Sequence, residues 1–214
     1  MANFKKMEET QVLDIEAINR NFNVELQQQI DGTLPKGHVY QMGMPQGILL
    51  SIGVPNMPIE LIASRLTVKS TQENHIFNLT EVKDLPKAIS NPIAVFSYGD
   101  KSKAVNIITE IEHNDNKFLV GMSLNPEVDG KKLEINSIRN VFPRDTSNWV
   151  LWIQQGKALY LNKEKIKVQM EQQRKTLADV PHLDINYIAK IINNFENPII
   201  LAENSQEIVK IVNF

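Results

Sequence analysis

Apolar residues recur at helical spacing near both ends of the chain. In residues 7–30, five apolar side chains share one face of an amphipathic helix: Ile15, Ile18, Phe22, Leu26 and Ile30. Asp31-Gly32 follows and is typical of a helix end. A second stripe predicts a helix over residues 185–195. We interpret the first helix as packed on the domain or on a second copy, with docking to a partner as the alternative.

The middle of the chain predicts an α+β fold, in which helices lead into an antiparallel sheet of about four strands. A central helix over residues 79–90 should be bent or cut short at Pro86 and end before Pro92. Four strands are expected at 93–96, 104–112, 117–124 and 158–161. The second and third of these form a hairpin, because residues 113–116 are a turn cluster.

Shorter patterns surround this centre. Short strands are expected near Val39 and at 59–62, and helical stretches at 46–52 and 64–69. Ile135, Ile138 and Val141 or Phe142 predict a helix that ends before Pro143. A helix should follow from about residue 146, and the charged stretch 163–174 indicates an exposed helix or a linker.

These patterns divide the 214 residues into an N-terminal helical arm (1–38), an α+β domain (39–170) and a C-terminal helical and extended tail (171–214). The absence of cysteine excludes disulfides, thiolate metal sites and a catalytic thiol. The start of the chain lacks the apolar core of a secretory signal, and no apolar run is long enough to cross a bilayer. We therefore expect a cytoplasmic protein with no membrane partner.

The charge of the chain limits the kinds of partner. Its net charge is −2, and the middle of the chain is only mildly basic. A protein that coats duplex nucleic acid normally shows a clear basic excess, whereas an enzyme that contacts two or three phosphates does not need one.

Few residues carry the patterns of a chemical site. No histidine pair has zinc-ligand spacing, no acidic cluster resembles a metal cradle, and no glycine-rich phosphate loop is present, so we expect no metal or cofactor. His113 lies in a polar turn and His182 in the tail. His75 directly precedes the central helix, and its ordinary pKa near neutrality suits an acid or a base.

Four runs in succession resemble the phage MuF C-terminal domain: HIFNLTEVKDLPKAISNPIAVF, AVNIITEIEHNDNKFLVGMSLN, INSIRNVFPRD and WIQQGKALYLNKEK. With the stretch that precedes them, the resemblance covers residues 39–170. That family is grouped with the barnase, EndoU, colicin and RelE-like nuclease folds. Its members occur in phages and conjugative elements and are expected to be ribonucleases, so the resemblance implies an RNA partner.

The resemblance also implies a site. His75 matches the family's histidine before the helix and would be the acid or base of metal-independent RNA cleavage. Ser137 and Arg144, in the third matching run, would contact the phosphate. The alternatives are that His75 caps the helix or satisfies a buried carbonyl, that Ser137 is a helix-surface or capping residue, and that Arg144 is solvated.

Other residues are weaker candidates. Arg139 and Lys69 are more typical of surface charges, and Thr109 of an ordinary strand position. Trp149 and Trp152 could stack on bases, but their helical spacing is more typical of a core.

A non-catalytic interaction module with the same fold is the rival hypothesis. It would bind a protein partner or form a homodimer through the sheet or the two terminal helices. The nearly balanced charge and the single well-placed histidine favour it. The nuclease hypothesis predicts a groove in which His75 and Ser137 lie within about 8 Å of each other, with a cation beside them.

Overall fold

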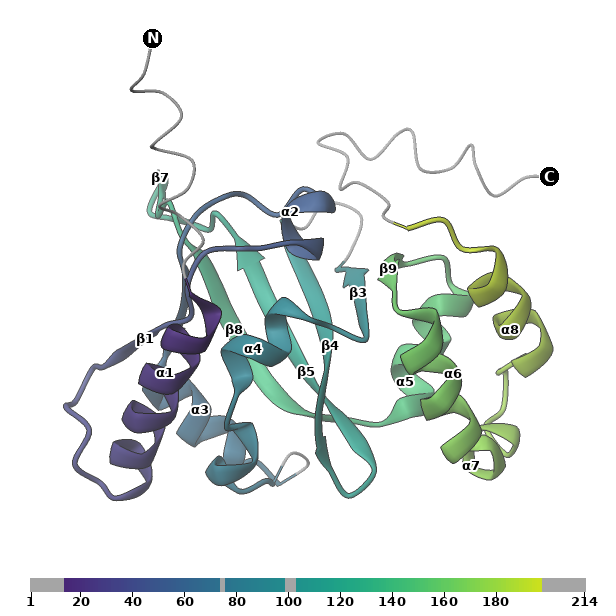
Figure 1. Ribbon diagram of the computed structural model, residues 1–214, viewed down its shortest axis with the longest axis horizontal. Helices are drawn as coiled ribbons and strands as arrows, with labels where there is room; N and C mark the ends of the chain where they lie inside the picture. Colours follow the sequence, from purple (N-terminus) through teal and green to yellow (C-terminus); the bar gives the residue numbers. More distant parts are fainter. Residues whose placement is uncertain (1–13, 74–75, 99–102, 198–214) are drawn as a thin grey trace, which may run out of the picture.

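The computed structural model describes residues 14–73, 76–98 and 103–197, in which a seven-stranded sheet carries helices on both faces. The strand order is β1-β2-β8-β5-β4-β3-β9, and every neighbouring pair is antiparallel except β2 and β8 (Figure 1). The strands are β1 (Val39–Gln41), β2 (Ile59–Ile62), β3 (Ala94–Ser97), β4 (Ala104–His113), β5 (Asn116–Leu124), β8 (Asn136–Arg144) and β9 (Ala158–Leu161). A separate hairpin joins β6 (Glu127–Val128) to β7 (Lys131–Lys132).

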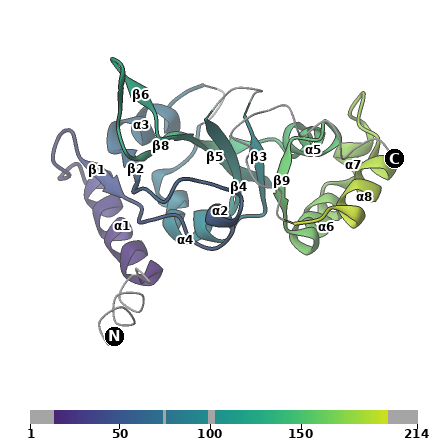
Figure 2. The same cartoon turned by 90° about the horizontal axis from the view of Figure 1, so that it is seen from above.

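Most helical elements of the first half of the chain cover one face of the sheet, whereas α3 (Ala63–Ser70) lies toward the other side in Figure 2. Figure 2 shows α1, α2 and α4 together on that side. The helical elements are α1 (Ile15–Ile30), α2 (Ile48–Ser51), α3 (Ala63–Ser70), the 3-10 helix η1 (Leu79–Val82) and α4 (Leu85–Ser90). They bury a core between themselves and the inward side chains of the sheet, which include Val105, Phe118 and Val120.

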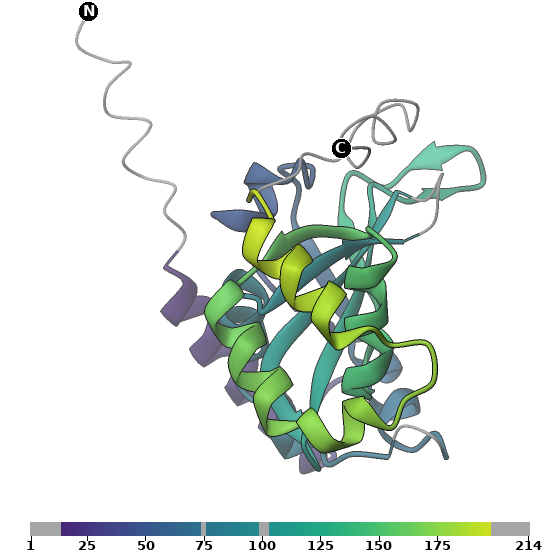
Figure 3. The same ribbon diagram turned by 90° about the vertical axis from the view of Figure 1, so that its right-hand side faces the viewer.

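The helices of the second half form a layer at the β9 end of the sheet, seen from the side in Figure 3. They are α5 (Thr146–Gln154), α6 (Lys163–Gln172), α7 (Arg174–Ala178) and α8 (Ile185–Asn194). A second core lies here, on the opposite face from the first, and includes Phe96, Trp149 and Ile188. None of the helices in the described ranges is both long and apolar enough to span a membrane.

Both predicted terminal helices pack on the sheet domain within the described part of the chain. Phe22 and Leu26 of α1 are fully buried, and Phe22 makes an edge contact with Tyr40 at 5.0 Å between ring centroids. Ile188 and Ile192 of α8 are equally buried in the second core. The apolar faces of these two helices are therefore already covered by the protein itself.

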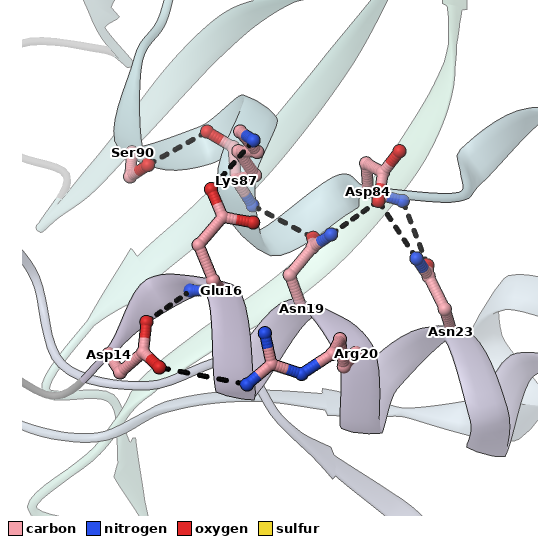
Figure 4. Close-up of polar contacts among 8 residues, drawn as sticks. All are labelled: Asp14, Glu16, Asn19, Arg20, Asn23, Asp84, Lys87 and Ser90. Carbon is pink, nitrogen blue, oxygen red and sulfur yellow. Dashed lines mark hydrogen bonds and ion pairs between the residues drawn. The ribbon is translucent and has the colours of Figure 1, made fainter.

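A polar cluster around Asp84 fixes α1 against α4 (Figure 4). Asp84 has a left-handed backbone (φ 63°) and directly precedes α4. Its Oδ1 accepts hydrogen bonds from Asn19 and from Asn23, the latter at 2.8 Å, and its backbone N–H donates to Asn23 Oδ1 at 2.9 Å. An ion pair between Lys87 and Glu16 at 2.7 Å lies beside it.

The α+β class and the antiparallel β3-β4-β5 meander are confirmed, but the expectation of about four strands is wrong. The error comes mainly from residues 136–144, which form strand β8 and not the predicted helix. Since β8 joins β2 and β1 to the rest of the sheet, missing it also isolates those two short strands. The part of the predicted C-terminal tail from residue 198 onward lies outside the described residues.

Candidate functional site

The outward face of β8 carries a run of polar side chains, and a β-bulge aligns them. Asn140 pairs with Gly121 and Ile138 pairs with Met122, so Arg139 is an extra residue without a partner in β5. A bulge shifts the in–out alternation of a strand by one residue. Ile138 and Val141 consequently both enter the first core, while Ser137 and Asn140 lie on the other face.

At the start of β8, Ser137 lies beside an arginine. Helix α3 follows β2 without a break, and this connection brings Arg65 next to β8. Arg65 Nη1 donates to Ser137 Oγ at 3.4 Å and to the carbonyl of Ile138 at 3.1 Å. Burial and the positive charge of Arg139 lower the pKa of Arg65. The guanidinium groups of Arg65 and Arg139 therefore repel each other next to the Ser137 hydroxyl. A bound anion would stabilise this arrangement.

At the other end of β8, Arg144 lies over an aromatic ring. Helix α5 begins directly after β8, with Asp145 as its N-cap. Its first turns bring Asn148 and Trp152 under Arg144: Arg144 Nη2 donates to Asn148 Oδ1 at 3.3 Å, and its guanidinium carbon lies 5.7 Å from the Trp152 ring centroid. Arg144 Nε is buried and has no hydrogen-bond partner within the described ranges.

The strand register separates the two predicted phosphate contacts. Ser137 pairs with Ser123 and Arg144 with Lys117, near opposite ends of β5. Seven residues of strand span roughly 20 Å, so one phosphate cannot contact both side chains. They do lie on the same face, with Asn140 between them.

His75 lies outside the described residues, so its distance to Ser137 and to Arg144 is not defined. The chain nearby is placed by Phe77, whose ring makes an edge contact with Phe118 at 5.0 Å between centroids. Phe118 pairs with Pro143 in β8. The described chain therefore resumes after His75 near the Arg144 end of β8, but on the face of the first core, opposite the outward face that carries Arg144.

The weaker candidates have ordinary structural contacts. Lys69 is bonded to Gln72 at the surface, and Thr109 is fully buried with its hydroxyl bonded to the Phe118 carbonyl. Trp149 is fully buried in the second core, whereas Trp152 is only partly buried and also makes an edge contact with Phe96.

Sequence reasoning missed three features of this region. Arg65 carried no motif, because only the β2–β8 pairing brings it to Ser137. Asn106 and Asn140 looked like ordinary polar positions. His113, read as a turn residue, has both ring nitrogens engaged: Nδ1 with Glu81 Oε2 at 2.7 Å and Nε2 with Asn114 at 2.8 Å.

No group of three or more histidine, aspartate or glutamate side chains in the described ranges is placed to hold a metal ion. The cations Arg65, Arg139 and Arg144 are instead suited to anions.

Comparison with known proteins gives one match. No curated protein and no solved structure matches the chain. A family model described as the phage MuF-C-terminal domain matches residues 66–168. These residues include β8, α5 and most of the sheet, but not α1, β1 or β2. Residues 66–168 of this chain are therefore similar to the phage MuF C-terminal domain family.

Proposed function

We propose that the domain is a metal-independent endoribonuclease of a phage or conjugative element, and that single-stranded RNA lies along the outward face of β8. The observation that carries this proposal is the arrangement of charge on that face. Arginines flank the polar stretch at both ends, Arg65 with Arg139 beside Ser137 and Arg144 on Trp152. An RNA chain places phosphates at intervals and bases between them, which this arrangement complements.

The chemistry assigned to this face is transesterification of RNA. A base removes the proton of a 2′-hydroxyl, the 2′-oxygen attacks the adjacent phosphorus, the bond from phosphorus to the 5′-oxygen breaks, and an acid protonates that oxygen. We assign His75 to one of the two proton transfers. Arg144 is only partly buried, and its guanidinium group would stabilise the charge that develops on the phosphate.

Ser137 and Arg65 would hold a second phosphate of the same chain. The Ser137 hydroxyl can donate to a phosphate oxygen while it accepts from Arg65. This assignment differs from the sequence-based one, in which Ser137 and Arg144 shared a phosphate, because the two residues lie near opposite ends of β8.

Incubation of the purified full-length protein with mixed-sequence RNA in the presence of a chelator tests the function. We expect cleavage by the wild type, none by His75→Ala, and a rate about 10²-fold lower for Arg144→Ala, the usual cost of losing a group that stabilises transition-state charge. Arg144→Lys should restore little of the rate, since lysine cannot reproduce the planar stacking on Trp152.

Arg174→Ala is the matched control, because Arg174 is exposed on α7 and pairs only at the surface with Glu171. It should cleave like the wild type. Equal cleavage by the wild type, His75→Ala and Arg144→Ala, or none by the folded wild type, would refute the proposal.

The interaction module remains the alternative function. In the form that uses the terminal helices, it needs apolar surface on α1 or α8. The described parts of these helices direct Phe22, Leu26, Ile188 and Ile192 into the two cores, which favours the nuclease proposal over a partner or homodimer bound through them.

A further inference from the structure

Three neighbouring strands place Asn106, Gly121 and Asn140 in one row across the sheet. Asn106 in β4 pairs with Gly121 in β5, and Gly121 pairs with Asn140 in β8. The row lies on the outward face of β8, between the Ser137 and Arg144 ends. Asn140 enters this row because the bulge at Arg139 shifts the alternation of the strand.

The two amide side chains of this row have no partners. Asn106 is only 8% exposed, yet within the described ranges neither its side chain nor that of Asn140 makes a hydrogen bond. The amide atoms of neither residue are among the fully buried polar atoms that lack a partner in the described ranges, so they reach solvent and are accessible to a ligand. Asn140 and Arg139 are only partly buried, so the row is open to solvent from the β8 side.

Both amides converge over the glycine. A Cβ on Gly121 would lie 3.4 Å from Asn140 Nδ2 and 3.5 Å from Asn106 Oδ1. A donor and an acceptor therefore face the same small space, which the missing side chain leaves free. The edge of a nucleobase offers the complementary pair, an acceptor beside a donor.

We propose that Asn106 and Asn140, with Gly121 between them, form a subsite that recognises the edge of one base of a single-stranded RNA. This inference rests on the proposed function, which it deepens by assigning sequence preference to named residues. Arg65 and Ser137 on one side and Arg144 with Trp152 on the other provide cations for the phosphates and an aromatic ring. That charge favours a nucleotide over a peptide, whose backbone is uncharged.

The affinity of the protein for short RNA oligomers tests the subsite independently of cleavage. The probes are fluorescein-labelled ten-residue oligomers of uridine, adenosine and cytidine, titrated with the full-length protein at low salt and followed by anisotropy. We expect the wild type to bind one oligomer about tenfold more tightly than the weakest one, as a pair of hydrogen bonds to a base edge allows.

Two variants remove the subsite by different means. Asn140→Ala deletes one amide. Gly121→Ala keeps both amides but puts a methyl group into the space between them, at ordinary van der Waals distances that the fold can accept. In both variants, the affinities for the different RNA oligomers should lie within about twofold of one another. The affinity for the oligomer that the wild type binds most weakly should be unchanged. Asn194→Ala, at an exposed position in α8, is the control and should keep the full preference.

The binding and cleavage measurements distinguish failure of the proposed subsite from failure of the proposed nuclease function. Binding without base preference in the wild type, a preference that survives in both variants, or no binding at all would overturn the subsite. A base preference without RNA cleavage would support the subsite and refute the nuclease function. RNA cleavage without a base preference would refute the subsite and support the nuclease function.

Discussion

Asp84 shows how one residue can hold two helices in place. A left-handed backbone is uncommon for residues other than glycine, asparagine and aspartate. The conformation of Asp84 is maintained by Asn19 and Asn23, which bind its carboxylate, while Asn23 also accepts from its N–H. These hydrogen bonds lower the pKa of the Asp84 carboxyl group.

The lowered pKa predicts a contribution of Asp84 to stability that depends on pH. Because the folded protein favours the ionised carboxylate, the contribution is present above the unfolded pKa of about 3.9 and is lost as the pH falls through the lower folded pKa. Asp84→Asn tolerates the left-handed backbone but removes the charge. We expect it to reduce the free energy of unfolding by about 1 kcal/mol at pH 7, a modest value because Asp84 is exposed.

Urea denaturation at pH 7 and near pH 3 checks this prediction, with the exposed Asp179→Asn as the control. The difference between Asp84→Asn and the wild type should shrink at the lower pH. A difference of the same size at both pH values would contradict it.

At the scale of elements, the strand that matters most is the one that the sequence pattern misassigns. Ile138 and Val141 are three residues apart and both face the first core. This spacing is typical of a helix, but here it results from the bulge at Arg139 in a strand. Most other elements follow their local patterns, including β3, β4, β5, β9, α1 and α5.

The same reasoning limits what the sequence reveals of the site. Pattern and resemblance single out Ser137 and Arg144, but their separation along β8 depends on a strand register that local sequence does not encode. Arg65 and Ser137 are 72 positions apart, so only the tertiary pairing of β2 with β8 brings them together. Asn106 looks like any polar residue of an alternating strand until its lack of a partner is seen.

Deletion of Arg139 tests the role of the bulge. Without the extra residue, β8 must either turn Val141 out of the core or turn Ile138 out of it, because the side chains of a strand alternate. We expect the deletion variant to lose its cooperative thermal transition, whereas Arg139→Ala, which keeps the bulge, should change the free energy of unfolding by no more than about 0.5 kcal/mol. Circular dichroism melts distinguish the two. A cooperative melt of the deletion variant near the wild-type temperature would show that the bulge is dispensable.

At the scale of the whole molecule, the two cores lie on opposite faces of one sheet. The first core includes α1 and the second includes α8. The helices at the two ends of the described chain therefore pack on the same sheet as the matched segment between them.

We therefore predict that α1 unfolds together with the sheet. Leu26→Ala should lower the free energy of unfolding by about 2–5 kcal/mol, because Leu26 is fully buried. Val24→Ala is the matched control on the same helix, since Val24 is 61% exposed, and it should stay within about 0.5 kcal/mol. Denaturation followed by tryptophan fluorescence reports on Trp149 and Trp152, which lie at the far end of the sheet. An unchanged tryptophan transition in Leu26→Ala would mean that α1 unfolds separately.

The parallel pairing of β2 with β8 has a consequence for synthesis on the ribosome. Ile59 pairs with Asn136, so β1 and β2 emerge long before the strand that they must join. Chains fold from the N-terminal end as they are made, and contacts between distant residues form slowly. The antiparallel pair of β1 and β2 must therefore wait, with the β2 edge open, until β8 has been translated.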